Sequence, residues 1–205
     1  SDNGVVIAQA LRDGTAVAVS DGSFKDKFRT AAWVIEGRRS DGRLEGQCII
    51  PGGPEDQSAY RSELGGLYAI AAMVQVICEL HNIQEGSIEV ACDGMNALAQ
   101  VGEADPIIRP NGAQYDIIAA TQAKIKRTNI QWKMRHVMGH QDDTQGCTVM
   151  DRWETLNCMM DERAKQHWQH HSTRTTRVQA AVDGEPWAVW TGSSKICGRL
   201  AAQVI

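Results

Sequence analysis

The chain has 205 residues and a mass of 22.5 kDa, with 42% hydrophobic and 22% charged residues. This composition fits one substantial folded domain and excludes disordered, collagen-like and mucin-like chains. Lys and Arg number 21 against 25 Asp and Glu, and the net charge of −4 excludes a strongly basic coat for nucleic acid. An anionic partner would therefore need a local basic patch or bound metal ions.

Targeting signals are not evident in the sequence. The N-terminus has neither the basic nor the apolar region of a signal peptide, and it lacks an initiator Met, which suggests a piece of a longer polypeptide. The six cysteines form no Cys-x-x-Cys pair, so we expect reduced thiols and an intracellular location, cytoplasmic or nuclear. Polar residues interrupt the most apolar stretch, 64–80, so we expect a buried helix there and no membrane contact.

The first half of the sequence predicts three short strands followed by a long helix. The strands are expected at 15–20, 31–36 and 44–50, joined by tight turns as an antiparallel meander. We place the first strand's end at the turn-like Asp21-Gly22-Ser23. Apolar residues three or four apart then predict a helix over 58–80.

The second half predicts a parallel addition to this sheet. A strand at 87–92 follows the long helix, so it should lie parallel to the first strand through a crossover connection. The remaining expected elements are a short helix at 96–101, a helix at 115–126, an alternating strand from 130 and a helix from a capping box at 151–154 to about 171. The fold class is therefore α/β, a mixed sheet flanked by helices, with no Gly-x-Gly-x-x-Gly motif to support a nucleotide cofactor.

The end of the sequence predicts an appended element. Trp187 to Trp190, a Thr-Gly-Ser-Ser turn and Lys195 to Cys197 predict a hairpin. We expect a main domain over 1–175 and a C-terminal hairpin extension over 176–205 that packs on it. The histidines 167, 170 and 171 are interpreted as a solvated helix end.

Four acidic residues fall where these elements should converge. Asp21 and Asp93 each follow an apolar strand, and the C-terminal ends of parallel neighbours meet at one edge of a sheet. Glu63 lies near the start of the long helix and Asp161 lies on the last helix. Crowded carboxylates repel each other unless a cation intervenes, and all-oxygen ligands favour Mg²⁺ or Mn²⁺ over Zn²⁺.

Each acid alone has an ordinary explanation. An Asp-Gly pair forms turns, a glutamate near a helix N-terminus complements the helix dipole, and Asp161 alone would be an exposed helical residue. The combination in this order favours a metal site, because only a shared site explains acids at several converging ends.

The same motifs resemble the type 1 ribonuclease H family, closest to the reverse-transcriptase-associated ribonuclease H domains of retroelements. The resemblance runs from about 15 to 171 and rests on Asp-Gly-Ser after a strand, Ser-x-x-x-x-Glu opening a helix, Asp-Gly after the fourth strand, Val-Met-Gly-His140 and Asn157-x-x-x-Asp161. It implies a five-stranded ribonuclease H-like sheet, with three antiparallel strands and then two parallel ones.

The resemblance also implies a function and a set of roles. The function is endonucleolytic, metal-dependent cleavage of the RNA strand of RNA/DNA hybrids, giving 5′-phosphate and 3′-hydroxyl ends. Two Mg²⁺ ions, with Mn²⁺ as a substitute, would be bound by Asp21, Glu63, Asp93 and Asp161, and His140 would assist catalysis. Expected substrate contacts are Gly22, Ser23, Arg61, Asn96 and Asn157, although Arg61 could instead pair with an acid.

Partners and rival functions follow from the same comparison. The expected partners are an RNA/DNA hybrid and a reverse transcriptase domain in the same polyprotein, and we expect a monomer without membrane contact. One rival is a catalytically silent ribonuclease H-like scaffold that binds nucleic acid. The other is an enzyme of the same fold with another substrate, such as a DNA transposase or an exonuclease.

Overall fold

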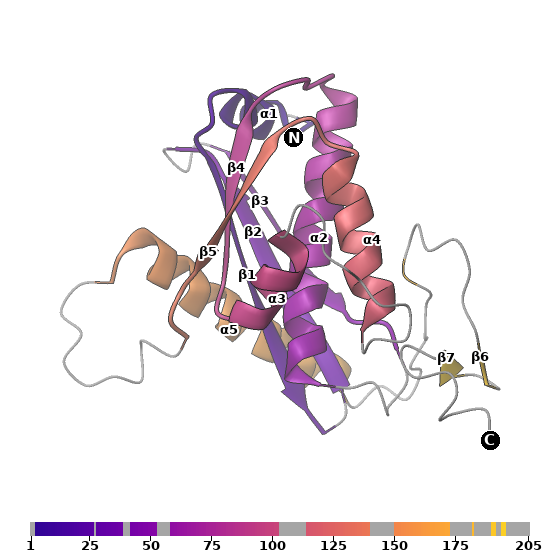
Figure 1. Ribbon diagram of the computed structural model, residues 1–205. Coiled ribbons are helices and arrows are strands. Elements are labelled where there is room, and N and C mark those ends of the chain that lie inside the picture. The colour runs from indigo at the N-terminus through magenta and orange to yellow at the C-terminus, as the bar shows by residue number, and fades with distance from the viewer. Residues whose placement is uncertain are drawn as a thin grey trace.

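A five-stranded mixed sheet forms the centre of the molecule (Figure 1). The computed structural model describes residues 3–26, 28–38, 42–52, 58–102, 114–139, 150–172, 182, 190–191 and 194–195. The strands are β1 (Ala16–Lys25), β2 (Phe28–Glu36), β3 (Arg43–Ile49), β4 (Ser87–Cys92) and β5 (Gln131–His136), in the order β3-β2-β1-β4-β5. β1, β2 and β3 pair antiparallel, whereas β4 pairs in parallel with both β1 and β5. The expected sheet is thereby confirmed.

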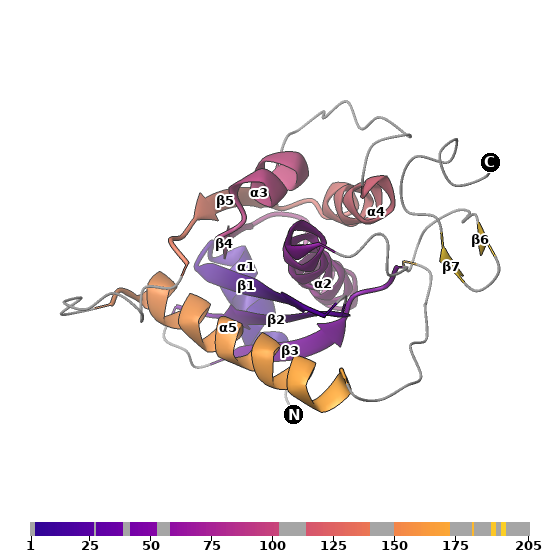
Figure 2. The same cartoon turned by 90° about the horizontal axis from the view of Figure 1, so that it is seen from below.

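Five helices in the described part of the chain cover the two faces of this sheet. They are α1 (Val5–Arg12), α2 (Ala59–Leu80), α3 (Met95–Gly102), α4 (Tyr115–Lys126) and α5 (Arg152–His171). Figure 2 shows α5, drawn in orange, on one face of the sheet and α2, α3 and α4 on the other. The alternation of side chains along the strands produces these two layers. Ala16 and Ala18 of β1 belong to the core cluster on the α2 face, and Val19 belongs to the cluster on the α5 face.

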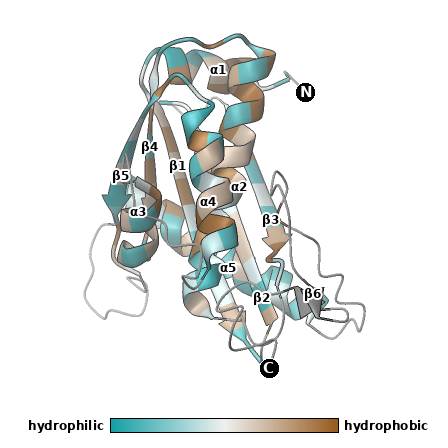
Figure 3. Ribbon diagram, turned by 45° about the vertical axis from the view of Figure 1, so that its right-hand side comes forward, coloured by the Kyte–Doolittle hydropathy of each residue, from teal (hydrophilic) through white to brown (hydrophobic). Residues whose placement is uncertain are grey.

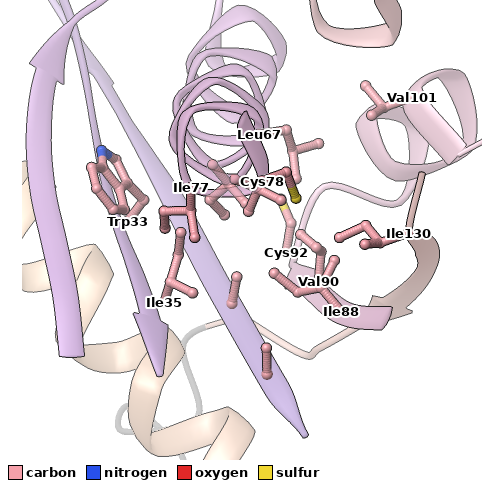
Figure 4. Close-up of a cluster of buried hydrophobic side chains, with 14 of the residues drawn as sticks. Trp33, Ile35, Leu67, Ile77, Cys78, Ile88, Val90, Cys92, Val101 and Ile130 are labelled. Atoms are coloured by element: carbon pink, nitrogen blue, oxygen red, sulfur yellow. The ribbon is translucent and has the colours of Figure 1, made fainter. Parts of the chain in front are cut away.

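The larger core cluster joins α1, α2, α3 and α4 to the sheet (Figure 4). α2 is the central helix of this cluster, with Leu64, Ile70 and Val74 fully buried. Figure 3 shows apolar residues along α2 and β4, whereas the edge strand β5 is largely hydrophilic. Among the described residues α2 is also long and apolar enough to cross a membrane, but it packs against β1, β2 and α4 here.

Two elements differ from the expectation. β1 does not end at Ser20, because it pairs with β2 as far as Lys25 opposite Phe28. The chain turns instead at Asp26, whose φ of 50° is left-handed. α1 was not among the expected elements, and it packs Ile7 and Leu11 into the larger core cluster.

The C-terminal extension is described only in part. β6 (Trp190–Thr191) and β7 (Ser194–Lys195) pair antiparallel, as a hairpin requires. Val182 is 3% exposed and belongs to the larger core cluster, so the chain contacts the main domain at this residue. The boundary between 175 and 176 lies outside the described residues and stays a prediction.

Candidate metal centre

Asp21 and Asp93 lie side by side because of the register between β1 and β4. Val19 pairs with Ala91, so the same parallel register continued by two residues places Asp21 opposite Asp93. β4 ends at Cys92, directly before Asp93. Asp21 therefore lies inside its own strand but beyond the end of the neighbouring one. The two carboxylates share the C-terminal edge of the parallel pair, where open sheets place ligand sites.

Glu63 reaches this edge because α2 lies unusually close to β1. A Cβ at Gly22 would lie 2.5 Å from the Ser62 Cβ and 2.7 Å from the Glu63 Oε1. Any side chain at Gly22 would therefore push the first turns of α2 off the sheet. The glycine predicted as a substrate contact has a packing function in this structure, and substrate contact at Gly22 stays a prediction.

Glu63, Cys92 and Asp93 form the tightest polar group of the site. One ligand atom from each lies within 4.8 Å of the other two. The Cys92 thiol donates to the Glu63 Oε2 at 3.1 Å and accepts from the Gly94 backbone N–H at 3.2 Å. Burial raises the pKa of Cys92 well above its ordinary value, and the charge of Glu63 raises it further. Cys92 is therefore a protonated hydrogen-bond donor, a role that the sequence alone did not suggest.

α5 supplies the remaining residues from the opposite face of the sheet. The Asn157 amide donates to the Asp21 Oδ2 at 3.2 Å. Asp161 lies one turn later and forms an ion pair of 2.5 Å with Lys165. Asn157 is 1% exposed and its amide positions Asp21, while direct substrate contact by Asn157 stays a prediction. Among the described residues, the buried Asn157 Oδ1 has no hydrogen-bond partner.

The carboxylates at this edge repel one another strongly. Burial, together with the charges of Glu63, Asp93 and Asp161, raises the pKa of Asp21 to about 9 from an ordinary value of 3.8. Burial and the charge of Asp93 raise the pKa of Glu63 to about 8. The ionised form of each group is unfavourable unless positive charge compensates it. These oxygen donors fit hard divalent cations such as Mg²⁺ or Mn²⁺.

The raised pKa values predict a pH-dependent stability in the absence of divalent metal. A carboxyl group whose pKa is higher in the folded state than in the unfolded state stabilises the fold when protonated. In EDTA, the contribution of these two groups to the free energy of unfolding should be greatest below about pH 4. It should decline as the pH rises from there and be lost above about pH 8 to 9, by roughly 2 kcal/mol or more in total. Urea unfolding at a series of pH values measures this. Saturating Mg²⁺ should flatten the decline, and an equal decline with and without Mg²⁺ would contradict metal compensation.

The predicted catalytic His140 lies outside the described residues. Its neighbour Gly139 lies against the site, since a Cβ there would be 2.6 Å from the Asp93 Oδ2. His136 is exposed at the end of β5, and its Nε2–H donates to the Asp93 backbone carbonyl at 3.1 Å. His136 thus holds the backbone that carries Asp93, while the role of His140 stays a prediction.

Arg61, for which substrate contact or pairing with an acid was expected, pairs with an acid. Its side chain is fully buried and forms two 2.7 Å hydrogen bonds to the Asp116 carboxylate. It also donates to the Gln114 Oε1 at 2.6 Å and to the Pro51 carbonyl at 2.8 Å. Arg61 therefore joins the first turn of α2 to the first turn of α4 inside the protein, and substrate contact by Arg61 stays a prediction.

The other predicted substrate contacts occupy different positions around the site. Ser23 is partly buried in β1, and its carbonyl accepts from the Ser62 hydroxyl at 3.4 Å. Asn96 is exposed in the first turn of α3, next to Met95, which is 63% exposed. Both side chains stay predicted substrate contacts.

The four cysteines within the described part of the chain are thiols, as expected for Cys48, Cys78, Cys92 and Cys158.

Comparison with known proteins gives structural neighbours only. No family model and no curated protein matches the sequence. One similar solved structure is the N-terminal RNase H domain of Rv2228c from Mycobacterium tuberculosis, with 14% identity, a TM-score of 0.44, and coverage of 74% of this chain and 96% of that one. Another is LC11-RNase H1, isolated from compost by a metagenomic approach, with 14% identity, a TM-score of 0.49, and coverage of 74% and 99%. At this identity the side chains of the site must decide the function.

Proposed function

We propose that this protein is a metal-dependent endonuclease that hydrolyses the RNA strand of RNA/DNA hybrids. The observation that carries the proposal is the convergence of Asp21, Glu63 and Asp93 at one sheet edge, with the charge of Asp161 acting on Asp21. Three separate elements, β1, α2 and α5, and the residue after β4 supply these acids. Such a costly concentration of negative charge is expected where cations are bound for catalysis.

The residues present fit a pair of hard divalent ions. Asp21, Glu63, Asp93 and Asp161 would hold them through carboxylate oxygens, and the unpartnered Asn157 Oδ1 is a further buried acceptor beside Asp21. Bound ions of this kind supply the charge that stabilises in-line attack of water on a phosphodiester and departure of the 3′-oxygen. That reaction leaves a 5′-phosphate and a 3′-hydroxyl.

The surrounding residues orient the carboxylates before any ion arrives. The Asn157 amide fixes the Asp21 Oδ2, and the Cys92 thiol fixes the Glu63 Oε2. His136 holds the Asp93 backbone from β5. Preorganised ligands of this type reduce the reorganisation needed during the reaction. In this proposal His140 handles the proton that leaves with the product, as the family resemblance implies.

Selectivity for RNA would come from the shape of the hybrid. An A-like duplex presents 2′-hydroxyl groups across a wide, shallow minor groove, and only the RNA strand carries them. The exposed Asn96, three positions after Asp93, carries an amide that can hydrogen-bond to such groups. In this proposal α3 carries a substrate contact.

The proposal is tested with three labelled duplexes: an RNA/DNA hybrid, duplex RNA and duplex DNA. We expect cutting of the hybrid alone, in Mg²⁺ and not in EDTA, and no cutting by Asp93→Asn. Unchanged hybrid cutting by Asp93→Asn would remove the proposed site from the reaction. No cutting under any condition would favour a silent scaffold, and cutting of duplex DNA would favour a DNA-processing enzyme.

A further inference from the structure

The last turn of α5 carries a pair of histidines apart from the acidic site. His167 and His171 are one helical turn apart and both partly buried, and their ring centroids lie 4.4 Å from each other. His170 differs from them, because it is exposed and its Nδ1–H donates to the Gln166 carbonyl at 2.8 Å. The three histidines are thus a facing pair and a separate third residue, and not a uniformly solvated helix end.

We propose that His167 and His171 bind one borderline divalent transition-metal ion, such as Ni²⁺, Zn²⁺ or Cu²⁺, with water as the remaining ligands. Residues four apart lie on the same face of a helix, which allows two rings to share one ion. A metal–nitrogen bond of about 2.0–2.1 Å places two chelating ring centroids roughly 5 Å apart. The observed centroid distance of 4.4 Å is close to that value.

The chemical state of the pair favours metal binding near neutral pH. Burial lowers the pKa of His167, and the charges of His171 and His170 lower it further. A neutral imidazole keeps the lone pair that a metal ion needs. Imidazole nitrogen suits Ni²⁺, Zn²⁺ and Cu²⁺, whereas Mg²⁺ prefers the oxygen ligands of the acidic site.

This end of α5 is held firmly against the sheet. The Thr30 hydroxyl donates to the Ala164 carbonyl at 2.6 Å, and the Trp168 indole N–H donates to the Lys25 carbonyl at 3.0 Å. These bonds flank His167 on the helix and restrict its backbone. The helix end that carries the pair is therefore held in place. Its site is separate from the acidic one, since His167 follows Asp161 by six positions, about 9 Å along the helix axis.

The test is calorimetric titration of the full chain, without a polyhistidine tag, with Ni²⁺ in saturating Mg²⁺. The magnesium is added to compete with nickel for the acidic residues. We expect one Ni²⁺ per chain, binding at least roughly tenfold weaker in His171→Ala and in His171→Gln because one arm of the chelate is lost. The matched control His170→Ala should bind like the unmodified protein.

Two outcomes would overturn the proposal. One is unchanged Ni²⁺ affinity in folded His171→Ala or His171→Gln, with folding verified by circular dichroism. The other is an equal loss in His170→Ala, which would indicate diffuse binding by the helix end. Paramagnetic broadening provides a direct readout, because Ni²⁺ should broaden the imidazole proton signals of His167 and His171 before those of His170. Neither measurement depends on nuclease activity.

Discussion

Replacing Asp21 with asparagine is expected to abolish hybrid cleavage and to stabilise the metal-free protein. Activity should fall by roughly 10³-fold or more, about 4 kcal/mol of transition-state stabilisation, because a ligand that faces the other three acids is lost. The metal-free fold should gain roughly 1–3 kcal/mol at neutral pH. With its pKa raised to about 9, the Asp21 carboxylate must take up a proton on folding, whereas the neutral amide needs none. Cleavage rates and urea unfolding in EDTA measure the two effects.

Asp161→Asn is the matched control for this substitution. Asp161 is less buried and already forms an ion pair with Lys165, so its neutralisation should lower activity without a gain in stability. A metal-free Asp21→Asn protein that is less stable than the unmodified chain would show that Asp21 is not under electrostatic strain. Retained cleavage by Asp21→Asn would remove this residue from the catalytic site.

Replacing Arg61 with alanine is expected to cause the largest loss of stability among single substitutions near the site. Its fully buried guanidinium binds both oxygens of Asp116, and alanine would leave that buried carboxylate without its cation. Breaking one side of a buried ion pair typically costs about 3–5 kcal/mol. Equilibrium unfolding in urea measures the loss.

A surface ion pair provides the control for Arg61. Arg163 forms a 2.7 Å pair with Glu45 at the protein surface, with both side chains about a third exposed. Arg163→Ala should therefore cost less than about 1 kcal/mol. The double substitution Arg61→Met with Asp116→Leu should recover part of the lost stability, because it removes both buried charges. Equal losses of stability in Arg61→Ala and Arg163→Ala would contradict a stabilising role for the buried Arg61–Asp116 ion pair.

Periodicity and turn chemistry were sufficient to predict most of the fold. The strand 87–92 and the helix 115–126 have the bounds that alternation and helical spacing indicate. α1 was missed because Val5, Val6 and Ile7 are β-branched and because Gly4 offers no capping side chain. β1 was ended too early because Asp21-Gly22-Ser23 has the composition of a turn, whereas pairing with β2 keeps it extended.

The sequence was sufficient to predict which acids form the site, but not how they are arranged in space. Strand order implies that Asp21 and Asp93 meet, and the register places them opposite each other. The close approach of α2 at Gly22 and the thiol of Cys92 depend on tertiary packing, which no local pattern encodes. The sequence left two roles open for Arg61, because its partner Asp116 lies 55 positions away along the chain and only the fold brings the two together.

Anomalous diffraction from a crystal soaked in Mn²⁺ tests most directly whether these acids form one metal centre. We predict two manganese peaks bounded by the carboxylates of Asp21, Glu63, Asp93 and Asp161, both lost in Asp93→Asn crystals. Manganese absent from this edge of the sheet, or bound only elsewhere in the molecule, would contradict the account.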